Sequence, residues 1–108
     1  MILNVHIHDQ THPVEIPDQL LSEAQGFFDK MDSDMSNGYQ MSRRWVDKPD
    51  EYQRCQIAAD KLVTALESAN QPMQQMMAAY ILSRLPGVHG VYINVEGDMT
   101  EHEFELRG

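Results

Sequence analysis

The sequence predicts an α+β domain in which a β-hairpin at each end of the chain packs on a layer of three to four helices. Three observations predict this class. Apolar and polar residues alternate near both ends, apolar residues recur every three or four positions between them, and 108 residues are enough for one core of ordinary size. The expected order is two strands, three or four helices and two strands, in a single domain over 1–108, with both hairpins in one sheet.

The N-terminal hairpin is predicted by the alternation of Leu3, Val5 and Ile7 with polar residues. A second strand returns after a turn at positions 9–10, which sets Val5 opposite Val14. Asp-Gln is poor chemistry for a two-residue turn, so a different loop stays open as an alternative. Any loop that preserves the parity leaves the same side chains on each face of the hairpin.

Helices are predicted over about 18–35, after Pro49, and from Pro72 to Leu85. The middle helix has the most regular apolar stripe of the chain, and proline is tolerated in the first turn of the last one. A short additional helix is expected over 39–46. The stripe of the middle helix consists of Tyr52, Cys55, Ala59, Leu62, Leu66 and Ala69.

The C-terminal hairpin is predicted by the alternation of Val91, Ile93 and Val95 with polar residues. Gly97-Asp98 suits a two-residue turn, which sets Val91 opposite Phe104. If both hairpins share one sheet, its outer face is expected to be acidic. The glutamates expected there are Glu15, Glu96, Glu101, Glu103 and Glu105.

Charge and cysteine content limit the function classes. The chain has 17 acidic and 8 basic residues, a net charge of −9, which argues against binding to a phosphate backbone. No apolar run is long enough for a membrane helix, and the N-terminus lacks the basic start of a signal peptide. Because Cys55 is the only cysteine, no disulfide framework exists. We therefore expect a cytoplasmic protein with no membrane or nucleic-acid partner.

Known catalytic and ion-binding motifs are missing from the sequence. It has no glycine-rich phosphate loop, no nucleophile elbow and no paired-histidine zinc protease motif. The segment from Asp32 resembles a calcium loop only at its start, because Asn37 occupies the glycine position and Arg43 the position of the bidentate glutamate. We expect a binding protein rather than an enzyme, with no catalytic residue and no cofactor assigned.

Three histidines provide the alternative of a metal site. Strand parity places His12 and His102 on the apolar faces of their hairpins, and His89 joins them if the strand extends back to Val88. Neutral imidazole is a good ligand for zinc, so these three residues are the candidate metal ligands. The competing interpretation is that each ring bonds a backbone carbonyl at a strand end.

Two groups of residues are candidates for binding a partner protein. Flexible thioethers fill irregular cores and also form adaptable binding surfaces, and the helix from Pro72 is rich in them. The other group is the only basic-aromatic cluster of the chain, and a surface salt-bridge patch is its alternative explanation. The candidates are Met73, Met76, Met77 and Tyr80, together with Arg43, Arg44 and Trp45.

The passage from Leu82 to Val91 resembles the helix-to-strand corner of ferredoxin-like metal-carrying domains. The cysteine pair of those carriers is absent, so the resemblance implies geometry and no function. The expected function is that of a small acidic accessory or regulatory protein that binds another protein, as a homodimer. The alternative from another class is a metal-binding protein or metal-dependent enzyme that uses the three histidines.

Overall fold

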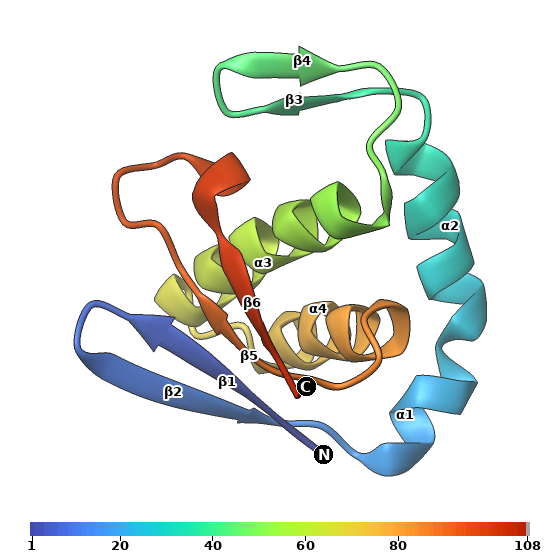
Figure 1. The fold of residues 1–108 in the computed structure, drawn as a ribbon. Coiled ribbons are helices and arrows are strands. Elements are labelled where there is room, and N and C mark those ends of the chain that lie inside the picture. The colour runs from blue at the N-terminus through green and yellow to red at the C-terminus, as the bar shows by residue number, and fades with distance from the viewer. Residues whose placement is uncertain (108) are drawn as a thin grey trace.

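The computed structural model describes residues 1–107 and confirms the α+β class. A sheet with the strand order β2-β1-β5-β6 lies in front of the helices α3 and α4, while α1 and α2 run along one side (Figure 1). The outer hairpins are antiparallel, and β1 and β5 join them in parallel. The strands are β1 (Ile2–Ile7), β2 (Gln10–Glu15), β5 (Val88–Tyr92) and β6 (Glu103–Leu106).

The N-terminal hairpin has the predicted faces but a register shifted by two residues. Val5 lies opposite His12, and the turn consists of His8 and Asp9. His8 adopts a positive φ of 55°, which lets this turn close where Asp-Gln is unfavourable. Because a shift of two keeps the parity, Val5 and Val14 still face the core.

The predicted helix over 18–35 is divided into α1 (Asp18–Glu23) and α2 (Gln25–Met35). The division falls at Ala24, whose backbone (φ −99°, ψ 13°) departs from helical geometry. Leu20 still accepts a hydrogen bond from the Ala24 amide, so the chain bends without losing this contact. The apolar periodicity continues across the bend, and therefore does not reveal it.

The predicted helix over 39–46 is wrong: this segment is a second antiparallel hairpin, β3 (Tyr39–Met41) and β4 (Arg44–Val46). Tyr39 and Met41 point inward and alternate with an exposed glutamine, which is the two-residue period of a strand. Ser42 takes a positive φ of 58° in the turn, and its hydroxyl accepts a hydrogen bond from the Met99 amide at 2.9 Å. The hairpin is thereby attached to the loop between β5 and β6.

The helices α3 (Glu51–Glu67) and α4 (Gln71–Arg84) form the centre of the core, as predicted. Asp50 caps α3 in a reciprocal capping box with Gln53. The facing surfaces contain many small side chains, which allow the two helices to approach closely and cover the inner face of the sheet. The buried residues at this contact include Cys55, Ala58, Ala59, Leu62, Ala78, Ala79 and Ile81.

The C-terminal hairpin has the predicted pairing of Val91 with Phe104, but its strands separate after Tyr92. A loop and a short 3-10 helix (Met99–Glu101) replace the predicted two-residue turn. Side chains of Asn94 and Asp98 accept hydrogen bonds from nearby backbone amides, and these local bonds compete with strand pairing.

Candidate functional site

The histidines predicted as metal ligands lie in different surroundings. His102 is 2% exposed, and its Nδ1 accepts a hydrogen bond from the Asn94 amide at 2.9 Å. The hydrogen of this ring is therefore on Nε2, which lies 3.4 Å from an Asp60 carboxylate oxygen. Both nitrogens of His102 thus have partners within the protein, but these are a backbone amide and a carboxylate and not the backbone carbonyl of the competing interpretation.

The other two candidate ligands do not join His102. His12 pairs with Val5 at the β1–β2 ladder, whereas His89 contacts Glu105 through Nδ1 at 3.2 Å. Among residues 1–107, no three histidine, cysteine, aspartate or glutamate side chains are arranged to hold a metal ion. A zinc site at His12, His89 and His102 would need a rearrangement of the sheet.

A different cluster, which the sequence analysis missed, forms on the outer face of the sheet around Glu105. One carboxylate oxygen lies 3.4 Å from His6 Nε2 and 3.2 Å from His89 Nδ1, and the other accepts the Tyr92 hydroxyl at 2.8 Å. The carboxylate sits directly over Gly90, where a Cβ atom would overlap it. The alternation of side chains along the two strands is sufficient to predict that His6 and Glu105 lie on outer faces. The parallel pairing of β1 with β5, which the sequence does not reveal, brings the two residues together.

The cluster includes a hydroxyl, an imidazole and a carboxylate in series. Thr11 Oγ1 lies 2.9 Å from His6 Nδ1. Because an ionised Glu105 only accepts hydrogen bonds, His6 Nε2 carries the hydrogen, and Nδ1 accepts from Thr11. Catalysis by such a series also requires a cavity with donors for a developing oxyanion. None of the hollows described below is lined by Thr11 or His6, so we assign this series a structural role.

Glu105 provides a pH-dependent prediction. The Tyr92 hydroxyl, with smaller contributions from His6 and His89, holds the pKa of Glu105 below its usual value. A carboxyl group with a lowered native pKa stabilises the fold above its unfolded pKa of about 4.3, and this contribution disappears as the pH falls through the native pKa. We expect Glu105→Gln to reduce stability at pH 7 and to have little effect at pH 2 in urea unfolding. Equal losses at both pH values would contradict the assignment, and Glu103→Gln is the control on the same strand.

A second polar cluster connects three helices through Asp32. One carboxylate oxygen accepts the Tyr80 hydroxyl at 2.5 Å and lies 3.2 Å from Arg54 Nε, while the other accepts Arg84 Nε at 2.9 Å. Burial, and then the bond to Asp32, raise the pKa of Tyr80, so its hydroxyl remains a donor. Arg84 also pairs with Asp29 at 3.1 Å. Since every charge has a partner, the cluster attaches α2 to α3 and α4 and is a structural feature.

Cys55 lies in the core, where burial raises the pKa of its thiol to about 12. A thiol in this state is neither a nucleophile nor a metal ligand at neutral pH. We expect the folded protein to react with a thiol-specific disulfide reagent at pH 8 only at the rate of its opening, and the denatured protein to react at once. A fast reaction of the folded protein would show that the thiol is accessible.

The predicted partner-binding residues on α4 divide into two groups. Met77 and Tyr80 are buried in the core, while Met76 is half-buried and Met73 is 38% exposed. The wide apolar face inferred from the sequence thus belongs to a helix that is covered on one side by the sheet and α3, and on another partly by α2. Of the four residues, Met73 offers the most surface to a partner.

Met73 lies on a groove between α2, α3 and α4. A hollow of about 230 Å³ is lined by Phe27, Met31, Met73 and Met77, with Lys30, Asp34 and Lys61 around it. A second hollow of about 380 Å³ shares Met73 and Lys61 and continues along Tyr39, Ala65 and Asn70. We call the two together the methionine groove. Phe27 is 42% exposed at its rim, although its neighbour Phe28 is buried.

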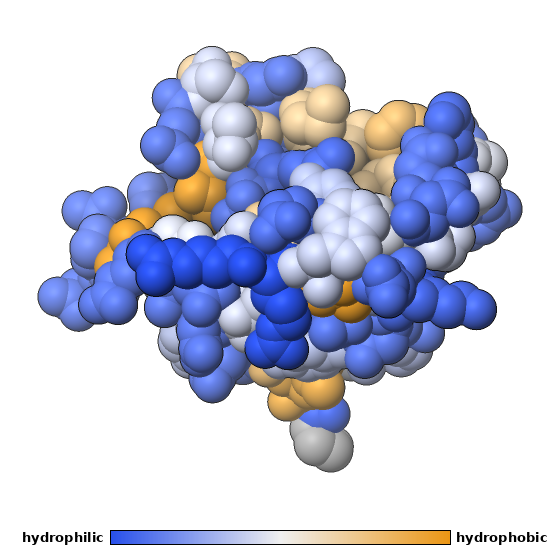
Figure 2. All heavy atoms as spheres, turned by 90° about the horizontal axis from the view of Figure 1, so that it is seen from above, coloured by the Kyte–Doolittle hydropathy of each residue, from blue (hydrophilic) through white to orange (hydrophobic). Residues whose placement is uncertain are grey.

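The residues Arg43, Arg44 and Trp45 lie on the β3–β4 hairpin and are exposed. Trp45 is 56% exposed, yet its ring is fixed, because it covers Gly38 and its indole nitrogen donates to Asp47 at 2.6 Å. Gly38 has a φ of 104° and no room for a side chain beneath the ring. Figure 2 looks onto this side of the molecule and shows a mainly hydrophilic surface, with hydrophobic residues in separate patches.

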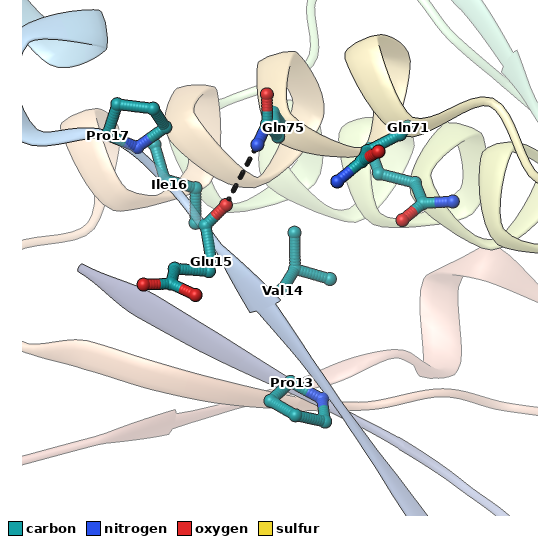
Figure 3. Close-up of a pocket in the computed structure, with 8 residues that line it drawn as sticks. Pro13, Val14, Glu15, Ile16, Pro17, Gln71 and Gln75 are labelled. Atoms are coloured by element: carbon teal, nitrogen blue, oxygen red, sulfur yellow. Dashed lines mark hydrogen bonds between the residues drawn. The ribbon is translucent and has the colours of Figure 1, made fainter.

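A further hollow, of about 440 Å³, lies between the edge of β2 and the start of α4 (Figure 3). Gln75 donates from its amide to the Glu15 carbonyl at 3.2 Å, and Gln74 to the Ala65 carbonyl at the same distance. Pro13 removes a donor from this edge strand, and both features protect the edge from pairing with another strand. Glu15 is the only acidic or basic residue that lines the hollow, so it offers no acid-base pair for catalysis.

Within residues 1–107, no helix is both long and apolar enough to cross a membrane. The chain was also compared with protein-family models, curated proteins and solved structures, and nothing in any of the three comparisons matches it.

Proposed function

We propose that this chain is a small accessory protein that binds another protein and does so as a homodimer, in which the methionine groove joins the two copies. The observation that supports this proposal is the exposure of Phe27 and Met73, which both line the smaller hollow, while Met73 also lines the larger one. Large apolar side chains at a concave surface lose unfavourable contact with water when a partner covers them.

The composition of the groove favours a protein partner. Met31, Met73 and Met77 have unbranched, polarisable side chains that adjust to the shape of an incoming apolar residue. Lys61 lies at both hollows and holds its ammonium group 5.9 Å from the centre of the Tyr39 ring, so the rim also carries charge. An apolar floor with a charged rim is the usual arrangement of a protein-binding groove.

We further propose that the homodimer is two-fold symmetric and that the protein acts in the cytoplasm. Two-fold dimers are the most frequent assemblies of soluble chains, and they bury the same surface on both copies. The compartment is supported by the single buried thiol at Cys55, which needs no oxidising environment.

Sedimentation equilibrium up to about 0.5 mM protein tests this proposal. We expect the native chain to dimerise and Met73→Glu to weaken the dimer at least about tenfold, because the substitution places a carboxylate in the apolar contact between the copies. Val95→Glu is the control, since Val95 is also an exposed apolar residue, 51% exposed, but lies in the loop between β5 and β6. A monomer across this range, or equal dimerisation of the Met73 variant, would overturn the proposal.

A further inference from the structure

The four-stranded sheet has an unusual distribution of charge. None of its strands contains a lysine or an arginine, although they contain three glutamates. Glu15 on β2 and Glu103 and Glu105 on β6 project from the outer face, opposite the helices, as the register of the ladders requires. The predicted acidic face therefore exists with these three members, whereas Glu96 and Glu101 lie outside the strands.

Of the three carboxylates, only Glu105 has ion-pair partners among the described residues. His6, His89 and Tyr92 surround Glu105, and Arg107 follows the last strand. The amino group of Met1 is engaged by the Asp18 carboxylate at 3.1 Å and by the Ile16 carbonyl. Glu15 and Glu103 form no ion pair within residues 1–107 and are exposed.

We propose that the outer sheet face docks an arginine-bearing segment of a partner protein. The proposal rests on the proposed role in protein binding, but it uses a face that shares no residue with the methionine groove. Its basis is charge complementarity: the four strands carry carboxylates and no lysine or arginine, which favours a cationic segment of a partner.

Tyr92 and Glu105 give this face a prepared contact for a guanidinium group. Tyr92 is 48% exposed and pairs with Glu103 across the β5–β6 ladder. Its ring stacks on His6, with centroids 4.5 Å apart, and its hydroxyl is bound to Glu105, so the ring is already ordered. An arginine that approaches Glu103 would meet an aromatic ring as well as a carboxylate, without the entropic loss of ordering either Tyr92 or Glu105.

An extended or helical protein segment fits this face better than a nucleic acid or a small cation. Nucleic acids are repelled by three carboxylates on the same surface. A linear polyamine lacks the planar group that pairs with a carboxylate and stacks on tyrosine. A nucleic acid and a linear polyamine therefore serve as the negative controls of the test.

The test is an NMR titration of the isotope-labelled protein with a peptide of alternating arginine and serine. The amide chemical shifts of the protein are recorded at each peptide concentration, at pH 7.5 and low salt. We expect shifts concentrated at Asn4, His6, Tyr92 and Glu103, and an affinity that falls as salt is added. The same peptide with glutamine in place of arginine, spermine, and a short single-stranded RNA are expected to leave these amides unchanged.

Two double variants separate this face from the net charge of the protein. Glu15→Gln with Glu103→Gln is expected to weaken peptide binding about fivefold to tenfold, from the loss of two ion pairs of up to about 1 kcal/mol each. Glu23→Gln with Glu67→Gln removes the same charge elsewhere and is expected to change the affinity less than about twofold. Equal weakening by both, shifts spread over the whole surface, or equal binding of spermine would overturn the proposal.

The peptide titration at the outer sheet face and the dimerisation test of the methionine groove can succeed or fail independently. Met73→Glu alters the methionine groove and leaves the outer sheet face unchanged, so it is expected to bind the arginine peptide as the native chain does. Loss of dimerisation with intact peptide binding would support both assignments separately. Absence of peptide binding in a chain that dimerises through Met73 would overturn only the assignment of the sheet face.

Discussion

Phe28→Ala is expected to lower the free energy of unfolding by about 4 kcal/mol, the largest effect of any single substitution considered for this protein. The Phe28 ring is fully buried and meets the Tyr80 ring edge to face, with centroids 6.0 Å apart. The guanidinium carbon of Arg84 lies 5.8 Å from the centre of the same ring. Removal of the ring leaves a cavity between α2 and α4, and urea unfolding monitored by circular dichroism measures the loss.

Phe27→Ala is the matched control for this prediction. Phe27 precedes Phe28 on the same helix, but it is 42% exposed, whereas Phe28 is fully buried. We expect a loss below about 1 kcal/mol from this variant, since little apolar area leaves the core. Comparable losses from both substitutions would show that α2 is not oriented as described, while a stable Phe27 variant with weakened dimerisation would also support the role of the groove.

Asp32→Asn is expected to lower the free energy of unfolding by about 3 kcal/mol at pH 7. The substitution leaves Arg54 and Arg84 without their shared carboxylate, and both guanidinium groups are largely screened from water. It also removes the charged acceptor of the Tyr80 hydroxyl, a bond that is worth more than one between neutral groups. Thermal and urea unfolding are the appropriate measurements.

Asp34→Asn tests whether this effect is specific. Asp34 lies one half-turn away and pairs with Lys30 at 2.9 Å, but both side chains are mostly in solvent. Such a pair contributes about 0.5 kcal/mol or less. A double-mutant cycle of Asp32→Asn with Tyr80→Phe is expected to give a coupling above about 1 kcal/mol, and additive losses would refute a direct interaction.

The sequence was sufficient for the parts of the fold that depend on local periodicity. Both hairpins, the long helix α3 and the helix that starts at Pro72 follow from apolar spacing and proline placement, and the structure confirms them. Parity fixes the faces but not the register: the pairing of Val91 with Phe104 is as predicted although the two-residue turn from which it was predicted is absent, whereas the N-terminal register differs by two residues. The hairpin over 39–46 was missed because three-residue strands are too short to establish a period of two.

The candidate sites depended on information that local patterns do not contain. Parity placed His6 and Glu105 on outer faces, but only the order of strands across the sheet makes them neighbours. Likewise, Asp32, Arg54 and Arg84 lie on three helices, and nothing in their separate segments indicates that they meet. Burial of Met77 and exposure of Met73 on one helix likewise follow from tertiary packing.

The parallel pairing of β1 with β5 also has a consequence for synthesis of the chain on the ribosome. Asn4 aligns with Gly90, so the two central strands come from nearly opposite ends of the polypeptide. During translation, β1 leaves the tunnel long before β5, and its inner edge stays unpaired until β5 has emerged. Closure of so long a loop slows folding. The nascent chain therefore exposes the edge of β1 until β5 emerges, which is the interval in which a chaperone or a second nascent copy would meet it.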